Sequence, residues 1–199
     1  DQARLAPQTI EDKYWMKRVL HLGGGGNVFE QNAIKNGLLN MENVIEQSMM
    51  GGEVNTYYKT STDVLQSAKI DDIKKLINTG INMLTFFGHS APGTWDFNVE
   101  DPSKFENFGR YPLINSLGCF SGNIHSTSQG LSERFVLTKD KGSIAFLASS
   151  GTAFISQLSN YGYNFYNKLG NKKYGITIGE VLNEILRENK DLQYAEYAF

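Results

Sequence analysis

Cysteine is almost absent from this sequence of 199 residues, since Cys119 is the only one. A single cysteine cannot form an internal disulfide, so cysteine pairing gives no indication of the redox compartment. The chain also lacks an excess of basic residues: its formal net charge is −2, which gives nucleic-acid binding no electrostatic support. It has no apolar run of about 18 residues, which a membrane-spanning helix requires, and no signal-peptide pattern at its start.

Hydrophobic residues make up 40% of the chain, which is enough to bury one core, so we expect one domain. Residues 1–14 are polar and turn-prone like a linker, and residues 15–199 form the expected folded unit. Apolar runs predict strands at residues 19–22, 54–60, 81–87, 112–118 and 143–149. Helical patterns cover residues 29–50 (split near Gly37), 61–78, 128–138, 155–169 and 177–189, and residues 91–111 are expected to form a long loop.

The alternation of strands and helices predicts an α/β fold, with a mostly parallel central sheet and helices on both faces. In such a sheet, ligands bind beyond the carboxyl ends of the strands. Four segments with informative chemistry follow predicted strands: the four glycines at 23–26, His89, Cys119, and the pair Ser149 and Ser150. We therefore expect these segments to share one rim and to form one site.

A nucleotide site or a metal site at this rim fits the sequence poorly. The dinucleotide fingerprint needs a third glycine where Val28 stands, so we interpret the glycine run as a place where backbone passes close to a neighbouring loop. Cys119 and His125 are six residues apart, but no second cysteine accompanies them, and we expect no metal and no cofactor. His21 lies inside an apolar strand and is interpreted as a buried strand histidine.

His89 and Cys119 suggest nucleophilic catalysis. A cysteine attacks as the thiolate, and a free thiol with a pKa near 8.5 is mostly protonated at neutral pH, so a neighbouring imidazole activates it. Groups at the ends of adjacent parallel strands, about 4.8 Å apart, converge on one substrate. Backbone N–H groups of Ser90 and Cys119 are the candidate oxyanion donors. The alternative interpretation is a strand-end histidine beside an inert buried thiol.

Three segments around these residues resemble the gingipain family of cysteine peptidases, within the caspase-like clan. GHSAPGTW at 88–95 resembles the histidine segment of the family, CFSGN at 119–123 its cysteine segment, and KGSIAFLASSG at 141–151 the strand that follows. The resemblance runs from about Trp15 to Lys190. It implies a caspase-like three-layer sandwich that acts as a cysteine endopeptidase, or as a sortase-like transpeptidase, through a thioester and without a cofactor.

The sequence departs from the gingipain pattern at positions that bear on the site. Ser90 follows the histidine where the family has glycine, and the glycine run supplies no acid to orient the histidine, so we expect a Cys–His dyad with Glu30 or Asp96 as possible orienting acids. Arg-specific members carry an aspartate where Asn27 stands. The expected substrate pocket, formed by Asn27, Ser149, Ser150 and Phe154, is neutral and favours a small, polar or apolar side chain before the cleaved bond.

The resemblance also carries expectations about context. It is strongest to secreted gingipain-like proteins of Bacteroidetes, including the sortase of the type IX secretion system, which implies an extracellular, cell-surface or outer-membrane-associated protein that is part of a longer chain. Expected partners are a polypeptide substrate, flanking domains and components of a secretion system, with neither nucleic acid nor a membrane span. The alternative function is a non-catalytic domain that binds peptides or proteins in a secretion complex.

Overall fold

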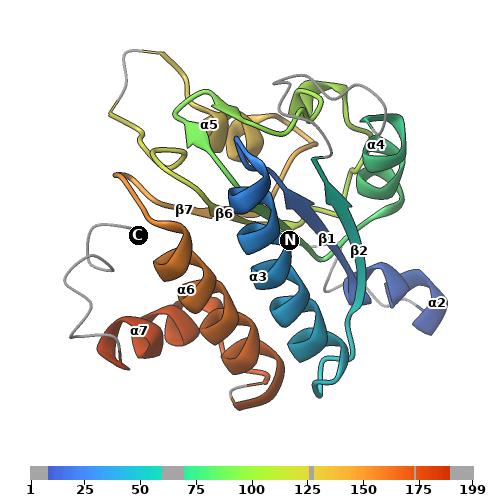
Figure 1. Cartoon of the computed structure of the whole chain (residues 1–199). Helices are drawn as coiled ribbons and strands as arrows, with labels where there is room; N and C mark the ends of the chain where they lie inside the picture. Colours follow the sequence, from blue (N-terminus) through green and yellow to red (C-terminus); the bar gives the residue numbers. More distant parts are fainter. Residues whose placement is uncertain (1–8, 60–69, 126–127, 173, 189–199) are drawn as a thin grey trace.

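A five-stranded parallel sheet forms the centre of the computed structural model, which describes residues 9–59, 70–125, 128–172 and 174–188 (Figure 1). The strand order is β2-β1-β3-β6-β7, and every neighbouring pair is parallel. The strands are β1 Arg18–Gly23, β2 Glu53–Tyr58, β3 Met83–Phe87, β6 Leu113–Leu117 and β7 Ala145–Ala148. The predicted α/β fold with a mostly parallel sheet is therefore confirmed, and each strand coincides with one of the apolar runs.

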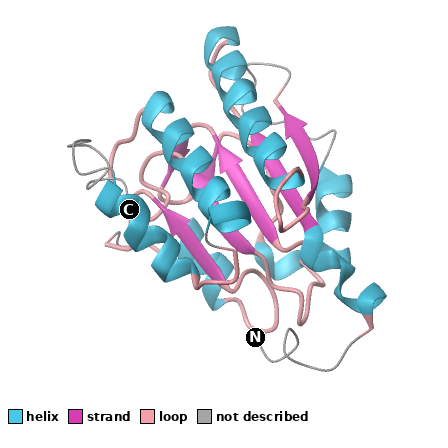
Figure 2. Ribbon diagram, turned by 90° about the horizontal axis from the view of Figure 1, so that it is seen from below, coloured by secondary structure: helices cyan, strands magenta, loops and turns pink. Residues whose placement is uncertain are grey.

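Helices cover both faces of the sheet, as Figures 1 and 2 show. On one face lie α3 Val28–Glu46, α6 Ile155–Asn167 and α7 Ile178–Glu188, and on the other lie α4 Ile70–Thr79 and α5 Leu131–Leu137. Shorter elements are α2 Ile10–Lys13, the 3₁₀ helices η1 Tyr14–Lys17 and η2 Pro102–Lys104, and the π-helical turn η3 Lys168–Lys172. The predicted three-layer arrangement is thus present.

Each strand serves two hydrophobic cores because successive side chains point to opposite faces. In β3, Met83 and Phe87 pack in the core beneath α3 and α6, whereas Leu84 and Phe86 pack in the core beneath α4 and α5. All five β3 residues are buried, which explains why the strand reads as a continuous apolar run rather than an alternating one.

Helix α3 corrects one sequence prediction, because it runs through Gly37 without a break. A Cβ atom at Gly37 would lie 2.8 Å from Phe87 Cε1 and 2.9 Å from Ser159 Oγ. The glycine therefore allows α3 to approach the sheet and α6 closely, and it does not interrupt the helix. The helix also ends at Glu46, earlier than the expected residue 50, with Gln47 as its C-cap.

The expected loop at residues 91–111 contains more order than its sequence indicates. Residues Ser90–Ala91 (β4) and Thr94–Trp95 (β5) form an antiparallel hairpin, and η2 follows. Trp95, Phe97 and Phe105 are buried in the core beneath α4 and α5, so aromatic side chains anchor this segment. In the linker-like N-terminal segment, Thr9 caps the helical turn α2. Of the helix predicted at 61–78, residues 61–69 lie outside the described residues and the remainder corresponds to α4.

Candidate active site

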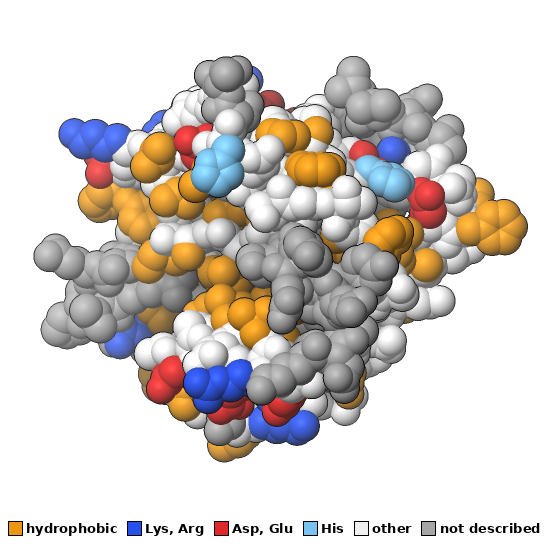
Figure 3. Space-filling model, turned by 90° about the vertical axis from the view of Figure 1, so that its left-hand side faces the viewer, with side chains coloured by type: hydrophobic (Ala, Val, Ile, Leu, Met, Phe, Trp, Pro, Cys, Tyr) orange, Lys and Arg blue, Asp and Glu red, His pale blue; other side chains and the backbone are white. Residues whose placement is uncertain are grey.

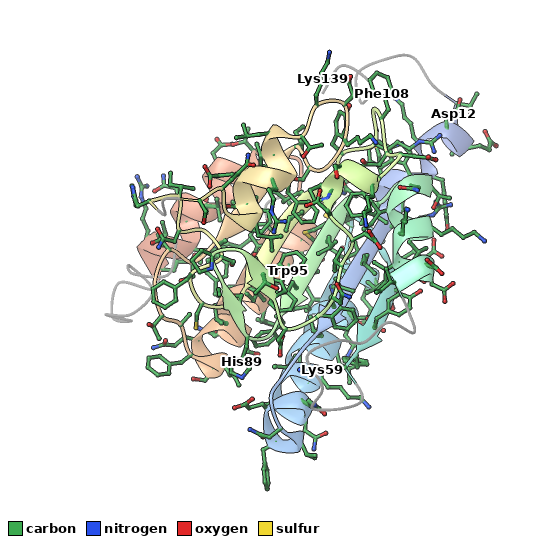
Figure 4. All side chains as sticks on the ribbon, turned by 90° about the horizontal axis from the view of Figure 1, so that it is seen from above. Asp12, Lys59, His89, Trp95, Phe108 and Lys139 are labelled. Atoms are coloured by element: carbon green, nitrogen blue, oxygen red, sulfur yellow. The ribbon has the colours of Figure 1, made fainter. Side chains whose placement is uncertain are left out.

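The sheet register brings His89 and Cys119 to neighbouring strand ends. Phe87 pairs with Leu117 at the carboxyl ends of β3 and β6, and each candidate residue lies two positions beyond its strand. Phe87 and Leu117 both face α3 and α6, and the side chains of His89 and Cys119 contact Glu30 on α3 and Ala153 just before α6. Figure 4 shows His89 at the end of the molecule opposite to Asp12, Phe108 and Lys139.

Glu30 is the acid that contacts the ring of His89. The distance between His89 Nε2 and Glu30 Oε2 is 2.8 Å. The same carboxylate oxygen accepts a hydrogen bond from the Gly26 N–H at 2.8 Å. The hydrogen bond from His89, followed by that from Gly26, lowers the pKa of the Glu30 carboxyl. Glu30 is therefore held as a carboxylate that accepts a hydrogen bond from His89 Nε2, which makes it, of the two acids expected from the sequence, the one in contact with the ring.

Asn27 explains how Glu30 reaches the histidine. The Asn27 side chain is the N-cap of α3 and its Oδ1 accepts hydrogen bonds from the N–H groups of Phe29 and Glu30. Glu30 thus occupies the third helical position, and its carboxylate bends back toward the helix start. The carboxylate accepts the N–H of Gly26, the residue before the N-cap, and it also contacts a histidine from another segment.

Asp96, the second acid considered from the sequence, contacts backbone rather than the His89 ring. Its Oδ2 accepts a hydrogen bond from the Gly25 N–H at 2.8 Å and lies 3.5 Å from the buried Lys59 Nζ. Its own N–H donates to the His89 carbonyl at 2.8 Å. Figure 4 shows Lys59 and His89 on the same side of the molecule. Asp96 therefore fastens the histidine segment to the glycine run.

The close approach of Asp96 explains why residues 23–26 are glycines, so no phosphate-binding role is needed to account for them. The Gly24 N–H donates to the Phe87 carbonyl at 2.8 Å, and a Cβ atom at Gly24 would overlap the carboxylate of Asp96. The interpretation that the run lets backbone pass close to a neighbouring loop is confirmed.

Cys119 sits at the start of a strained turn. Phe120, the next residue, has φ 56°, in the left-handed region that bulky residues rarely adopt. The Phe120 N–H donates to the Gly151 carbonyl at 2.9 Å, and the Gly122 N–H donates to the Ser149 carbonyl at 2.9 Å. These bonds hold the conformation, which directs the Cys119 side chain toward Ala153: Sγ lies 3.4 Å from the Ala153 N and 3.5 Å from its O.

Ser90 joins the two chemical segments directly. Its hydroxyl donates to the Cys119 carbonyl at 2.6 Å and lies over Gly118, where a Cβ atom would overlap it. Ser90 pairs with Trp95 in the hairpin, next to the hydrogen-bonded pair of His89 and Asp96. Because hydrogen-bonded and non-hydrogen-bonded pairs alternate in an antiparallel ladder, the Ser90 N–H points away from β5.

A buried hydrogen-bond chain beneath the cysteine turn was not predicted from the sequence. Trp95 Nε1–H donates to Ser116 Oγ at 2.9 Å, and Ser116 Oγ lies 2.7 Å from Ser121 Oγ. Trp95 stacks on Phe86 with ring centroids 4.6 Å apart, so the indole packs in the core beneath α4 and α5. The only sequence signal was the pair of serines, Ser116 in an apolar strand and Ser121 inside CFSGN.

The expected pocket residues divide into two groups. Ser150 and Phe154 are exposed near the sulfur, on the segment that leads into α6. Ser149 is fully buried and its hydroxyl donates to the Gly151 carbonyl at 2.8 Å, so it shapes this segment from within and does not offer its hydroxyl to a substrate. Asn27 is exposed, but the α3 cap occupies its Oδ1.

The remaining histidines have other surroundings. His21 is fully buried and its Nε2 lies 2.8 Å from Tyr166 Oη, as expected for a strand histidine. His125 is exposed beyond the cysteine turn. Within the described ranges, no three His, Cys, Asp or Glu residues are placed to hold a metal ion.

A comparison with protein families identifies the chain. The sequence pattern described as peptidase family C25 matches residues 4–198. The chain belongs to this family. The gingipain-like resemblance carried by His89, Cys119 and their flanking residues is thereby confirmed, and the family is one of cysteine peptidases. No curated protein matches the chain significantly.

Solved structures support the fold of this C25 member. The crystal structure of the Arg-specific cysteine proteinase gingipain R matches with a TM-score of 0.68 and 16% identity, over 90% of this chain and 44% of that one. The complex of Porphyromonas gingivalis RgpB pro- and mature domains matches with a TM-score of 0.68 and 15% identity, over 92% and 45%. The chain therefore has the caspase-like fold of gingipain and spans less than half the length of these structures.

Two further features lie apart from this site. An apolar cavity of about 630 Å³ lies at the opposite, amino-terminal end of the sheet, between the starts of β3, β6 and β7 and residues 174–178.

Over the part of the chain that the structure describes, no helix is both long and apolar enough to cross a membrane.

Proposed function

We propose that this domain cleaves peptide bonds through Cys119, His89 and Glu30. The observation that carries the proposal is the 2.8 Å contact between His89 Nε2 and Glu30 Oε2. A carboxylate on Nε2 requires the proton to reside there, which leaves Nδ1 as the basic nitrogen. The histidine is therefore prepared to accept a proton from a thiol on the neighbouring strand end.

The proposed reaction follows from these positions. The Cys119 sulfur attacks the carbonyl carbon of the substrate as its thiol proton moves to His89 Nδ1. The N–H groups of Cys119 and Ser90 stabilise the negative charge that develops on the carbonyl oxygen. The imidazolium then gives its proton to the leaving amine, and a thioester remains on Cys119. Glu30 stabilises the imidazolium and holds the ring in one tautomer.

The second half of the reaction determines whether the enzyme is a peptidase or a transpeptidase. Water that attacks the thioester gives hydrolysis, and a second amine gives a new peptide bond, as a sortase would form. Adding a primary amine as acceptor and analysing the products by mass spectrometry distinguishes the two. The extracellular or surface location, the flanking domains and the secretion-system partners remain proposals that rest on the gingipain resemblance.

Glu30 also weakens the rival proposal of a non-catalytic binding domain. Two features favour that alternative, the absence of an acid in the glycine run and the absence of a partner domain from this chain, and α3 supplies the acid. A binding domain has no requirement for a carboxylate that orients a histidine at the strand end next to a cysteine, whereas a cysteine nucleophile depends on an activating imidazole.

The test compares Cys119→Ala, His89→Ala and Glu30→Gln with the natural protein on a peptide library that varies all positions around the cleaved bond. We expect no cleavage with the first two variants. Glu30→Gln loses a hydrogen bond between charged groups in the transition state, which corresponds to a decrease in kcat/KM of roughly 10- to 100-fold.

Glu133→Gln is the matched control. Glu133 Oε2 accepts the Gly130 N–H at 2.7 Å at the start of α5, so this variant also loses a capping carboxylate but leaves His89 alone. Equal losses in Glu30→Gln and Glu133→Gln would contradict the proposed role of Glu30. Absence of any cleavage, together with iodoacetamide labelling of Cys119 no faster than that of a small thiol, would favour the binding domain.

A further inference from the structure

We propose that the site accepts polypeptides with apolar side chains next to the cleaved bond and does not select arginine or lysine. This inference rests on the function proposed above and adds its substrate class. It separates this chain from the Arg-specific gingipain whose fold it shares. Two independent features support it: the engagement of the nearby carboxylates, and the apolar side chains that surround the site.

Both acids near the reactive residues have one carboxylate oxygen engaged, and the second oxygen of Asp96, Oδ1, is buried against Gly24 and Gly88 without a hydrogen-bond partner in the described part of the chain. Glu30 Oε2 accepts hydrogen bonds from His89 and from the Gly26 N–H, and turning it toward a substrate would break the contact on which His89 depends. Asp96 is bonded to the Gly25 N–H and lies 3.5 Å from Lys59 Nζ, with only 14% of its side chain exposed. Its negative charge is thus already balanced by an internal cation.

A basic side chain in this site would therefore lack a dedicated carboxylate among the described residues. Selection of arginine depends on a bidentate pair between its guanidinium and a carboxylate, and selection of lysine depends on a nearby negative charge. Asn27, at the start of α3, is neutral, and its oxygen is committed to the helix cap. Enclosing a guanidinium here would remove its hydration without replacing it.

Large apolar side chains surround the site on three segments. We name them the apolar rim: Val28, Phe29, Phe120, Ile124 and Phe154, with exposed fractions of 65, 87, 39, 59 and 55%. Phe29 precedes Glu30, Phe120 follows Cys119, and Phe154 follows the residue that contacts the sulfur. Figure 3 shows hydrophobic side chains between histidine side chains on one face of the molecule.

The apolar rim fits a substrate polypeptide because it is continuous with the reactive groups. Exposed apolar side chains that gather in one place mark binding surfaces, since each gains from removal of its surface from water. Bound next to a scissile bond, apolar residues of the substrate would cover these side chains.

The test measures cleavage of a library in which every amino acid is sampled on both sides of the bond, followed by kinetics on the best peptide. Phe29→Ser and Phe154→Ser should each raise KM about fivefold, with kcat and iodoacetamide labelling of Cys119 unchanged. The matched control is Phe108→Ser, because Phe108 is 73% exposed and lies at the end of the molecule remote from His89 (Figure 4).

The outcomes separate this inference from the proposed function. Cleavage next to apolar residues, abolished in Cys119→Ala and weakened in the two rim variants but not in Phe108→Ser, supports the inference. Efficient Cys119-dependent cleavage after arginine or lysine overturns it while the peptidase function stands. Rim variants that behave like Phe108→Ser also overturn it. Absence of cleavage of every peptide overturns the proposed function, and the inference with it.

Discussion

Acid should destabilise this protein through His21, a histidine that takes no part in the proposed chemistry. His21 is fully buried in β1, and burial lowers its pKa from 6.5 to about 3. Its Nε2 lies 2.8 Å from Tyr166 Oη, which in turn lies 2.7 Å from Thr85 Oγ1. The native protein therefore keeps the ring neutral under conditions in which the unfolded chain protonates it.

The sign and size of the effect follow from proton linkage. A group whose pKa is lower in the native state makes the unfolded chain bind more protons, so the free energy of unfolding decreases as pH falls below 6.5. Between pH 7 and pH 5, one such histidine removes about 2 kcal/mol. This is a substantial part of the 5–15 kcal/mol that is typical of a domain.

Urea unfolding at pH 7 and pH 5, followed by the fluorescence of the buried Trp15 and Trp95, measures the effect in the natural protein and in His21→Gln. Glutamine keeps a polar group near Tyr166 but does not titrate. The variant should lose about 2 kcal/mol less than the natural protein over this range. The contact between His89 and Glu30 is present in both proteins and cancels in the difference.

The same loss in both proteins would refute this reasoning. So would a native-state NMR titration in which the His21 ring protonates near pH 6.5, since the ring would then be as accessible to protons as in the unfolded chain. A constant difference between the two proteins at both pH values would report only the lost packing of the imidazole.

Two further predictions concern the frame of the site. Gly24→Ala places a Cβ atom against the Asp96 carboxylate and should lower the free energy of unfolding in urea by about 1–3 kcal/mol. Gly93→Ala, with nothing within 4 Å of the new atom, should lower it little, and equal decreases in the two variants would contradict the contact. Ser90→Ala removes the hydrogen bond from the Ser90 hydroxyl to the Cys119 carbonyl and should lower kcat about tenfold with little change in KM. An unchanged kcat would show that this hydrogen bond does not position the cysteine.

The sheet could be predicted from the sequence because its strands are buried on both faces and read as separate apolar runs. The runs around Phe87 and Leu117 both end in glycine followed by a reactive residue, which was sufficient to place His89 and Cys119 at one rim. The prediction that the helix is split near Gly37 was wrong. Glycine in a helix usually signals a break, and here close packing against Phe87 and Ser159 requires it instead.

The partner of His89 was harder to predict because its contact spans 59 residues of sequence. The spacing of Asn27 and Glu30 did carry a signal, since an asparagine followed three residues later by glutamate is typical of a capping box. That pattern places the acid at the start of a helix but does not say what else it contacts. The hairpin at Ser90 to Trp95 was missed because two-residue strands are too short to show alternation.

The β4–β5 hairpin couples the two faces of the sheet. Ser90 contacts the cysteine segment at the rim, and Trp95, its partner across the hairpin, is buried among the aromatic rings beneath α4 and α5. The proposed oxyanion donor Ser90 is therefore held in place by packing on the side of the sheet remote from α3 and α6. A ligand or substitution that repacks the rings around Trp95 would alter the proposed catalysis without touching the substrate, Cys119 or His89.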